Sequence, residues 1–140
     1  MNYLLDTNVL TEMRRRQPNA NVAGWFAQTS DQQLYVSVLN LAEIRKGIAK
    51  LEVSQQRTEL EQWLDDVLTP YFAGRILAVD LETALLWGQL SGEAERQGQP
   101  LPAIDTLLAA TAIRHELTLV TRNERDFRRM PVTLYNPWLE

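Results

Sequence analysis

The feature that most constrains the fold is a series of short apolar runs separated by helical patterns. Five runs have the length of buried strands, at residues 3–5, 34–36, 76–79, 117–120 and 132–135. Such runs are apolar on both faces, which is typical of strands in a parallel sheet that is covered on both sides. They predict a central, mainly parallel sheet of four to five strands.

Helical patterns between these runs supply the covering layers. Apolar side chains recur at helical spacing through residues 41–51, 60–67, 81–90 and 104–111, with one helix expected to stop near Pro70. Strands that alternate with helices require right-handed crossovers. We therefore expect a three-layer α/β/α sandwich. The 140 residues contain no repeat or linker, so the expectation is a single domain over residues 1–140.

Composition excludes several kinds of site. The chain has no cysteine, so it holds no disulfide, zinc–thiolate site or cysteine nucleophile, and a reducing compartment suits it. His115 is the only histidine, which excludes a ribonuclease with two imidazoles and a zinc site made of His and Cys. A phosphodiesterase of this composition must therefore use carboxylates and a metal.

Location and charge limit the partners. The first residues lack a basic segment, and no apolar run approaches the roughly 20 residues of a membrane helix. We expect a cytoplasmic protein with no membrane partner. A net charge of −4 argues against a general nucleic-acid coat, whose affinity comes from many cation–phosphate contacts.

Polar residues follow several of the predicted strands, and ligands of open parallel sheets bind outside the carboxyl ends of the strands. One of these residues, Asp80, is followed by Leu81, Glu82 and Thr83 and is interpreted as a helix N-cap. The full set is Asp6, Ser37, Asp80, Thr121 and Asn136.

Asp6 and Asp105 are the strongest candidates for chemistry. Asp6 ends the first strand, and Thr7 and Asn8 add oxygen atoms that suit a hard cation. Asp105 begins a helix that is apolar almost all round, where an ionised carboxylate is costly unless a cation or hydrogen-bond donors compensate it. The alternatives are a helix cap at Asp6 and an exposed first-turn carboxylate at Asp105.

Glu43 gives a weaker signal. It falls off the apolar stripe of its helix, on the face of Asn40. Periodicity alone favours an exposed ion pair between Glu43 and Lys46. Glu43 becomes a candidate site residue only because Asp6 and Asp105 are also present.

The segment after the fourth predicted strand is also ambiguous. Thr121 and Glu124 fit a capping box that would start a helix. Asn123 or Asp126 could still present an oxygen atom to a cation or to its water.

Arginines could contact RNA at two places. Arg14 and Arg15 end the first predicted helix, where cations also have a structural reason to lie. Arg122 and Arg125 follow the fourth strand and suit bidentate phosphate contacts, although such a run is also typical of a solvated helix face.

Four segments together resemble the motifs of the PIN-domain family. They are Leu-Leu-Asp-Thr-Asn-Val at 4–9, Leu-Asn-Leu-Ala-Glu-Ile-Arg-Lys-Gly at 39–47, Ala-Ile-Asp-Thr-Leu-Leu-Ala-Ala-Thr-Ala at 103–112 and Leu-Val-Thr-Arg-Asn-Glu-Arg-Asp-Phe at 119–127. Their order and spacing match over essentially the whole chain. Residues 71–76 and the ending Tyr-Asn-Pro-Trp at 135–138 are similar to the FitB branch of VapC-type toxins.

The resemblance implies that Asp6, Glu43 and Asp105 form a site for Mg²⁺, with Mn²⁺ as a substitute. The fourth motif departs from the fullest pattern, because Asn123 stands where close relatives can carry aspartate. An amide oxygen binds a cation less strongly than a carboxylate does. A second metal is therefore in doubt, with Asp126 as the residue that could compensate.

The resemblance also implies a metal-dependent endoribonuclease, the toxin of a toxin–antitoxin pair, with RNA as substrate, a cognate antitoxin as partner and a homodimer. Residues 51–68 are a candidate docking region, or simply pack on the sheet. Two other functions stay open: a phosphotransfer domain with an acidic pocket, and a PIN-like binding module without catalysis. Asn8 disfavours the first, because phosphatases carry aspartate two residues after the nucleophile.

Overall fold

A five-stranded parallel sheet forms the centre of the molecule in the computed structural model, which describes residues 1–139. The strand order is β3-β2-β1-β4-β5, and every neighbouring pair is parallel. The predicted sheet is thus confirmed, with three strands shorter than their apolar runs. The strands are β1 (Tyr3–Leu5), β2 (Leu34–Ser37), β3 (Ile76–Leu77), β4 (Thr118–Val120) and β5 (Leu134–Tyr135).

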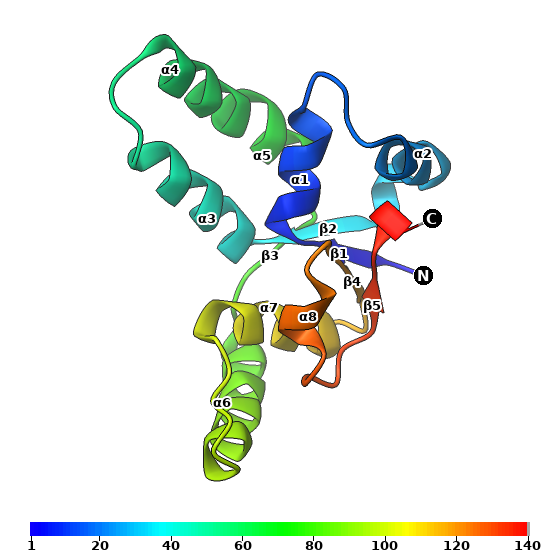
Figure 1. Ribbon diagram of the computed structural model, residues 1–140, viewed down its shortest axis with the longest axis vertical. Helices are drawn as coiled ribbons and strands as arrows, with labels where there is room; N and C mark the ends of the chain where they lie inside the picture. The colour runs from blue at the N-terminus through cyan, green and yellow to red at the C-terminus, as the bar shows by residue number, and fades with distance from the viewer. Residues whose placement is uncertain (140) are drawn as a thin grey trace.

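Helices cover both faces of the sheet, which confirms the three-layer sandwich (Figure 1). One layer contains α1 (Thr7–Arg14), α2 (Ala20–Gln28), α3 (Val38–Ala49), α4 (Gln55–Gln62) and α5 (Thr69–Tyr71). The other contains α6 (Leu81–Arg96), α7 (Ala103–Arg114) and α8 (Glu124–Phe127). Short 3-10 turns at Asp31–Gln33 and Pro137–Leu139 complete the described elements. Within residues 1–139, no helix has both the length and the apolar character needed to cross a membrane.

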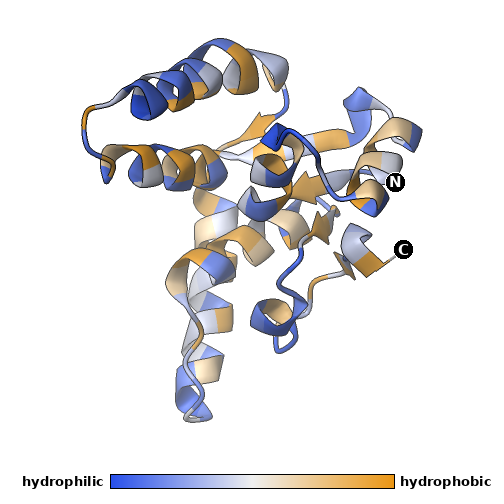
Figure 2. Ribbon diagram, turned by 45° about the horizontal axis from the view of Figure 1, so that its top comes forward, coloured by the Kyte–Doolittle hydropathy of each residue, from blue (hydrophilic) through white to orange (hydrophobic). Residues whose placement is uncertain are grey.

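The core lies in two parts, one on each side of the sheet. Because side chains of a strand alternate between its faces, Leu4 packs with α7 and α8 while Leu5 packs with α1 and α3. Leu119 and Val120 divide in the same way. The strands are accordingly mostly hydrophobic, whereas the helices carry many hydrophilic residues (Figure 2).

The helical arm after α3 corrects one prediction. A π-helical segment, Trp63–Leu68, joins α4 to α5, and the backbone stays helical to Tyr71, which confirms the predicted stop near Pro70. Proline is tolerated there because it lies in the first turn of α5. The wider turn also changes which side chains face inward. Leu64 is buried, while Val67, predicted on the same stripe, is exposed.

Helix α6 also buries a different face from the one predicted. Leu81 and Leu85 are 73% and 64% exposed, whereas Thr83 and Ser91 are buried. The reason is that α6 packs mainly on α7 and not on the sheet. Asp80 caps this helix as predicted, since its carboxylate accepts a hydrogen bond from the backbone N–H of Thr83 at 2.9 Å.

Candidate active site

Asp6 lies at the centre of the carboxyl edge of the sheet. It follows β1, which is flanked by β2 on one side and β4 on the other. It is the N-cap of α1, and its Oδ1 accepts a hydrogen bond from the backbone N–H of Thr7 at 2.8 Å. Asp6 is therefore the helix cap that the sequence suggested, and it is also placed where the elements that carry the other acids meet.

Two side chains hold the second carboxylate oxygen of Asp6. The hydroxyl of Thr121 donates to Oδ2 at 2.8 Å, and Nδ2 of Asn8 donates to it at 3.3 Å. Thr121 is fully buried, and Asp6 is only 9% exposed. The carboxylate is thus fixed in one orientation by residues from two neighbouring strand ends.

The predicted capping box at Thr121 is wrong. The N-cap of α8 is Asn123, and it makes no side-chain capping bond. The Thr121 hydroxyl accepts the backbone N–H of Asn123 at 3.0 Å and donates to Asp6, 115 residues away. Glu124 is bonded by Nδ2 of Asn136 instead of reaching back to Thr121. The hydroxyl group that the local pattern predicted as a helix cap therefore makes a tertiary hydrogen bond with Asp6 instead.

Glu43 is joined to the same site through Thr7. The Thr7 hydroxyl donates to Oε1 of Glu43 at 2.8 Å and accepts from Nδ2 of Asn40 at 3.2 Å. Asn40 is fully buried, and its Oδ1 closes a capping box with the backbone N–H of Ser37. The start of α3 is thereby tied to the start of α1. Sequence reasoning placed Asn40 on the face of Glu43 but missed this role.

Asp105 interacts electrostatically with three other acids. Burial of the carboxyl group, followed by the charges of Asp6, Asp126 and Glu43, raises the pKa of Asp105 to about 6. The first turn of α7 is exposed at Ile104, while Asp105 itself is half-buried. The structure thus places Asp105 within electrostatic reach of Asp6, Glu43 and Asp126, all of which are candidates from the sequence.

The pKa of Asp6 is also raised. Burial is the largest cause, the hydrogen bonds from Thr121 and Thr7 oppose it, and the charges of Glu43 and Asp126 add to it. The charge of Asp126 acts on both Asp6 and Asp105. Asp126 and the neutral Asn123 are both exposed at the start of α8, so both stay candidates for the fourth position.

The ligand chemistry of this cluster suits a hard divalent cation. Its donors are carboxylate, hydroxyl and amide oxygens, which favour Mg²⁺ or Mn²⁺ over softer metals. Within residues 1–139, no three acidic or histidine side chains are already closed around a point as a metal cage. Burial, and after it the charges of neighbouring acids, raises the pKa of both Asp6 and Asp105, and a bound cation would oppose both effects.

The four candidate arginines lie in two places. Arg14 and Arg15 are at the end of α1, about 12 Å along the helix from Asp6. The Arg14 guanidinium lies over the ring of Trp63, and Arg15 pairs with Glu12 at 3.3 Å. In contrast, Arg122 and Arg125 line a hollow of about 340 Å³ together with Asn123 and Asp126. The second pair therefore lies beside the acids, and the first pair lies away from them.

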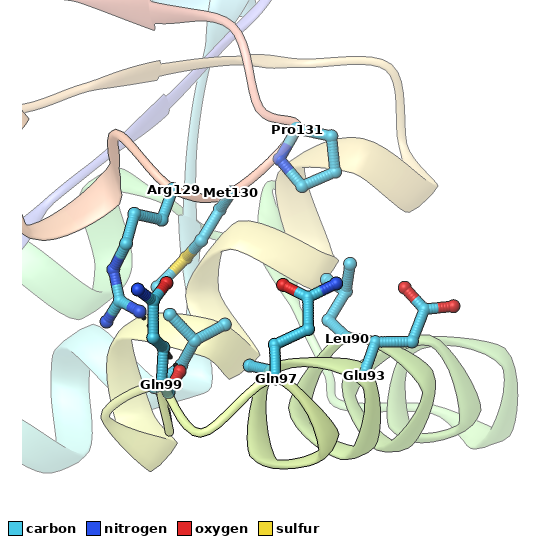
Figure 3. A pocket seen from close by; sticks show the side chains of 9 residues that line it. Leu90, Glu93, Gln97, Gln99, Arg129, Met130 and Pro131 are labelled. Carbon is cyan, nitrogen blue, oxygen red and sulfur yellow. Dashed lines mark hydrogen bonds between the residues drawn. The ribbon is translucent and has the colours of Figure 1, made fainter.

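Another hollow, of about 230 Å³, lies between the end of α6 and residues 129–131 (Figure 3). Arg129 crosses it and donates to the backbone oxygens of Gln99 and Pro100 at 3.0 and 3.3 Å. This arginine holds the loop between α6 and α7. None of the four acids lines this hollow, so it is separate from the candidate active site.

The contact between Thr121 and Asp6 yields a first prediction. Thr121→Val keeps the shape of the side chain but removes the donor to Asp6 and the acceptor for Asn123. Residues that orient a metal ligand typically contribute 10- to 100-fold, so we expect activity or metal affinity to fall by roughly that factor. Thr118→Val is the matched control, because Thr118 is also buried in β4 and lies outside the site. Equal effects of both variants on cleavage would contradict the role given to Thr121.

Comparison with known proteins is consistent with this arrangement. Residues 3–132 match the family model of the PIN domain. The chain is 38% identical over 135 residues to toxin FitB of Neisseria gonorrhoeae, covering 96% of this chain and 97% of that protein. It is 31% identical to the VapC ribonuclease Y4jK of Sinorhizobium fredii, covering 96% of each. The crystal structure of FitAcB from Neisseria gonorrhoeae superposes with a TM-score of 0.88 at 38% identity, covering 97% of this chain and 98% of that one.

Proposed function

Because this chain belongs to the PIN domain family, we propose that it is a ribonuclease that hydrolyses RNA phosphodiester bonds with a divalent cation held by its clustered acids. The observation that carries the proposal is the junction of two acids at Thr7, whose backbone N–H donates to Asp6 and whose hydroxyl donates to Glu43, with the charges of both acids acting on Asp105. Carboxylates gathered at one site ionise at a cost unless a cation neutralises them. The family and the arrangement of acids thus point to the same chemistry.

The acids have distinct places in this proposal. Asp6 and Asp105 would hold the cation, Glu43 would bind it directly or through a water, and Asp126 or Asn123 would take the fourth position. When bound, the cation, Mg²⁺ or Mn²⁺, supplies Lewis acidity that lowers the pKa of a water and neutralises charge on the phosphate. Thr121, which donates to Asp6, keeps this carboxylate oriented.

The chain's own groups would then complete the hydrolysis. The attacking water loses its proton to a carboxylate of the cluster, a new phosphorus–oxygen bond forms, and the bond to the leaving oxygen breaks. The leaving oxygen takes a proton from solvent. The hydrogen bond from Thr7 keeps Glu43 beside the start of α1 during this exchange.

We also propose that the chain is the toxin of a toxin–antitoxin pair, with a cognate antitoxin as its partner and a homodimer as its assembly. The relatives named as a toxin and as a VapC ribonuclease support this biological role. The physical support is the acidic site itself, since an arginine side chain from a partner would be attracted to it and would compete with the cation.

The nature of the RNA ends tests the reaction type. We expect the purified chain with Mn²⁺ to cut bulk transfer, ribosomal or messenger RNA without forming a 2′,3′-cyclic phosphate, because a water and not the 2′-hydroxyl attacks phosphorus. End-labelling and mass spectrometry of the fragments measure this outcome. Cyclic phosphate ends, or no cleavage of any of these RNAs, would contradict the proposal.

The structure disfavours phosphotransfer through Asp6. Asn8 stands where phosphatases carry a second aspartate, and its Nδ2 donates to Oδ2 of Asp6, so the position offers no carboxylate for proton transfer. A covalent aspartyl-phosphate at Asp6, detected by mass spectrometry after incubation with acetyl phosphate, would decide for that alternative.

A further inference from the structure

We infer that the C-terminal turn formed by Asn136, Pro137 and Trp138 is a positioning part of the active site, which holds Arg122 for contact with an RNA phosphate. The inference rests on the proposed ribonuclease function. It deepens that function by assigning a phosphate-binding arginine near the acids and a role for the Trp138 ring.

Asn136 ties the turn to the loop that follows β4. Its Nδ2 donates to the backbone oxygen of Arg122 at 3.4 Å and to Oε2 of Glu124 at 3.3 Å. Its Oδ1 accepts the backbone N–H of Trp138 at 2.9 Å. One amide group therefore fixes residues on both sides of Asn123 and the tryptophan at the same time.

Trp138 supports the Arg122 side chain. The guanidinium carbon of Arg122 lies 5.3 Å from the centre of the Trp138 ring, which is a cation–π contact. The ring itself is held, because Trp138 packs against the core cluster of Leu5 and Val9, and Asn21 donates to its backbone oxygen at 3.0 Å. A stacked guanidinium keeps its N–H edge available for bidentate contact with a phosphate.

Arg122 is also connected to the acids. Oδ1 of Asn8 accepts the backbone N–H of Arg122 at 3.2 Å, while Nδ2 of Asn8 donates to Asp6 and to Thr121. Hydrogen bonds therefore run from Asp6 through Asn8 and Arg122 to Asn136. A shift of the turn would move the arginine relative to the metal-binding acids.

Charge gives the arginine a role in substrate binding. The chain carries a net charge of −4, and four of its acids gather at the site where a polyanion must bind. Phosphates that flank the scissile one need cations of the protein, because the metal serves only the reacting group. The side chain of Arg122 is exposed and lines the hollow that also contains Asp126, so it is placed at the rim of the acids.

The test compares cleavage kinetics and their salt dependence in the full-length chain with Mn²⁺. We expect Arg122→Ala to raise KM about 10-fold with a smaller change in kcat. It should also reduce the slope of log(kcat/KM) against log salt by about one, the value for one lost phosphate contact.

Trp138→Leu should also raise KM, while the KM of Trp138→Phe, which keeps an aromatic face, should stay within about 3-fold of wild type. Because both residues act through one contact, the double variant Arg122→Ala/Trp138→Leu should be no worse than Arg122→Ala alone.

Trp25→Leu is the matched control for lost core packing. Trp25 packs in the same cluster, and within residues 1–139 its ring contacts are with Tyr3, Phe26 and Tyr135, not with Arg122. It should lower the melting temperature and leave KM and the salt slope unchanged. If Trp138→Leu does not fold, Asn136→Ala replaces it, with the same expected increase in KM.

Two results would overturn the inference. One is a Trp138→Leu variant, or its Asn136→Ala substitute, that behaves like Trp25→Leu. The other is an Arg122→Ala variant with an unchanged salt slope. If the wild-type chain cleaves RNA and Asp6→Asn does not, either result contradicts the role of the turn but not the ribonuclease function. If the wild-type chain does not cleave RNA, both the ribonuclease function and the role of the turn are contradicted.

Discussion

The Asp6→Asn variant is expected to cleave RNA about 1000-fold more slowly than the wild-type chain. Asp6 is buried and oriented by Thr7, Thr121 and Asn8, so an amide in its place would lose the charge that holds the cation without a nearby replacement. Charge stabilisation of several kcal/mol by a bound metal corresponds to roughly three powers of ten in rate. Single-turnover cleavage of RNA with Mn²⁺ measures the effect.

Asp80→Asn is the matched control for this substitution. Asp80 also caps a helix through its carboxylate, and asparagine is an equally good cap, so this variant should keep full activity and a native fold. Asp6→Asn should also fold, because the amide oxygen can still accept the backbone N–H of Thr7 that caps α1. Full activity of Asp6→Asn would end the proposed mechanism.

Removal of divalent cations is expected to abolish cleavage completely. A chelator should inactivate the wild-type chain, and excess Mg²⁺ or Mn²⁺ should restore it, because the clustered acids cannot approach a phosphate without a counter-ion. The ion should also stabilise the fold, by roughly 2.7 kcal/mol at 100 times its dissociation constant. Cleavage assays and urea unfolding, each with and without chelator, measure the two effects. Undiminished cleavage in chelator would show that the acids serve another purpose.

The same acids predict how the metal-free chain responds to pH. Folded Asp105 keeps its proton up to a pKa of about 6, whereas the unfolded chain releases it near 3.8. Between these values the folded state binds more protons, so stability should fall as the pH rises from about 4 to about 7. Asp105→Asn should reduce this decline in urea unfolding with chelator present. A decline of the same size in Asp105→Asn would mean that other groups cause it.

The sheet and its order of elements could be predicted because they depend on local patterns. Apolar runs such as residues 34–36 must be buried on both faces whatever lies around them, and strand ends are where a parallel sheet exposes polar groups. Asp6 and Asp105 could be selected on these grounds. Their roles as metal ligands remain predictions, as does a role for Asp126 or Asn123 in the fourth position.

Features that depend on distant partners could not be predicted in this way. The hydroxyl of Thr121 fits a local capping box, yet a carboxylate 115 residues away competes for it and prevails. Glu43 fits an exposed pair with Lys46, yet it is bonded by Thr7, 36 residues away. The outward face of α6 and the role of Trp138 have the same origin, because each depends on which element lies beside it in space.

The position of β1 between β2 and β4 has a consequence for how the protein is made. Asp6 follows β1 and leaves the ribosome long before β4, and the threonine that orients this acid comes 115 residues later, at position 121. Until that segment has been synthesised, β1 lacks its β4 neighbour and Asp6 lacks the hydroxyl group that orients it.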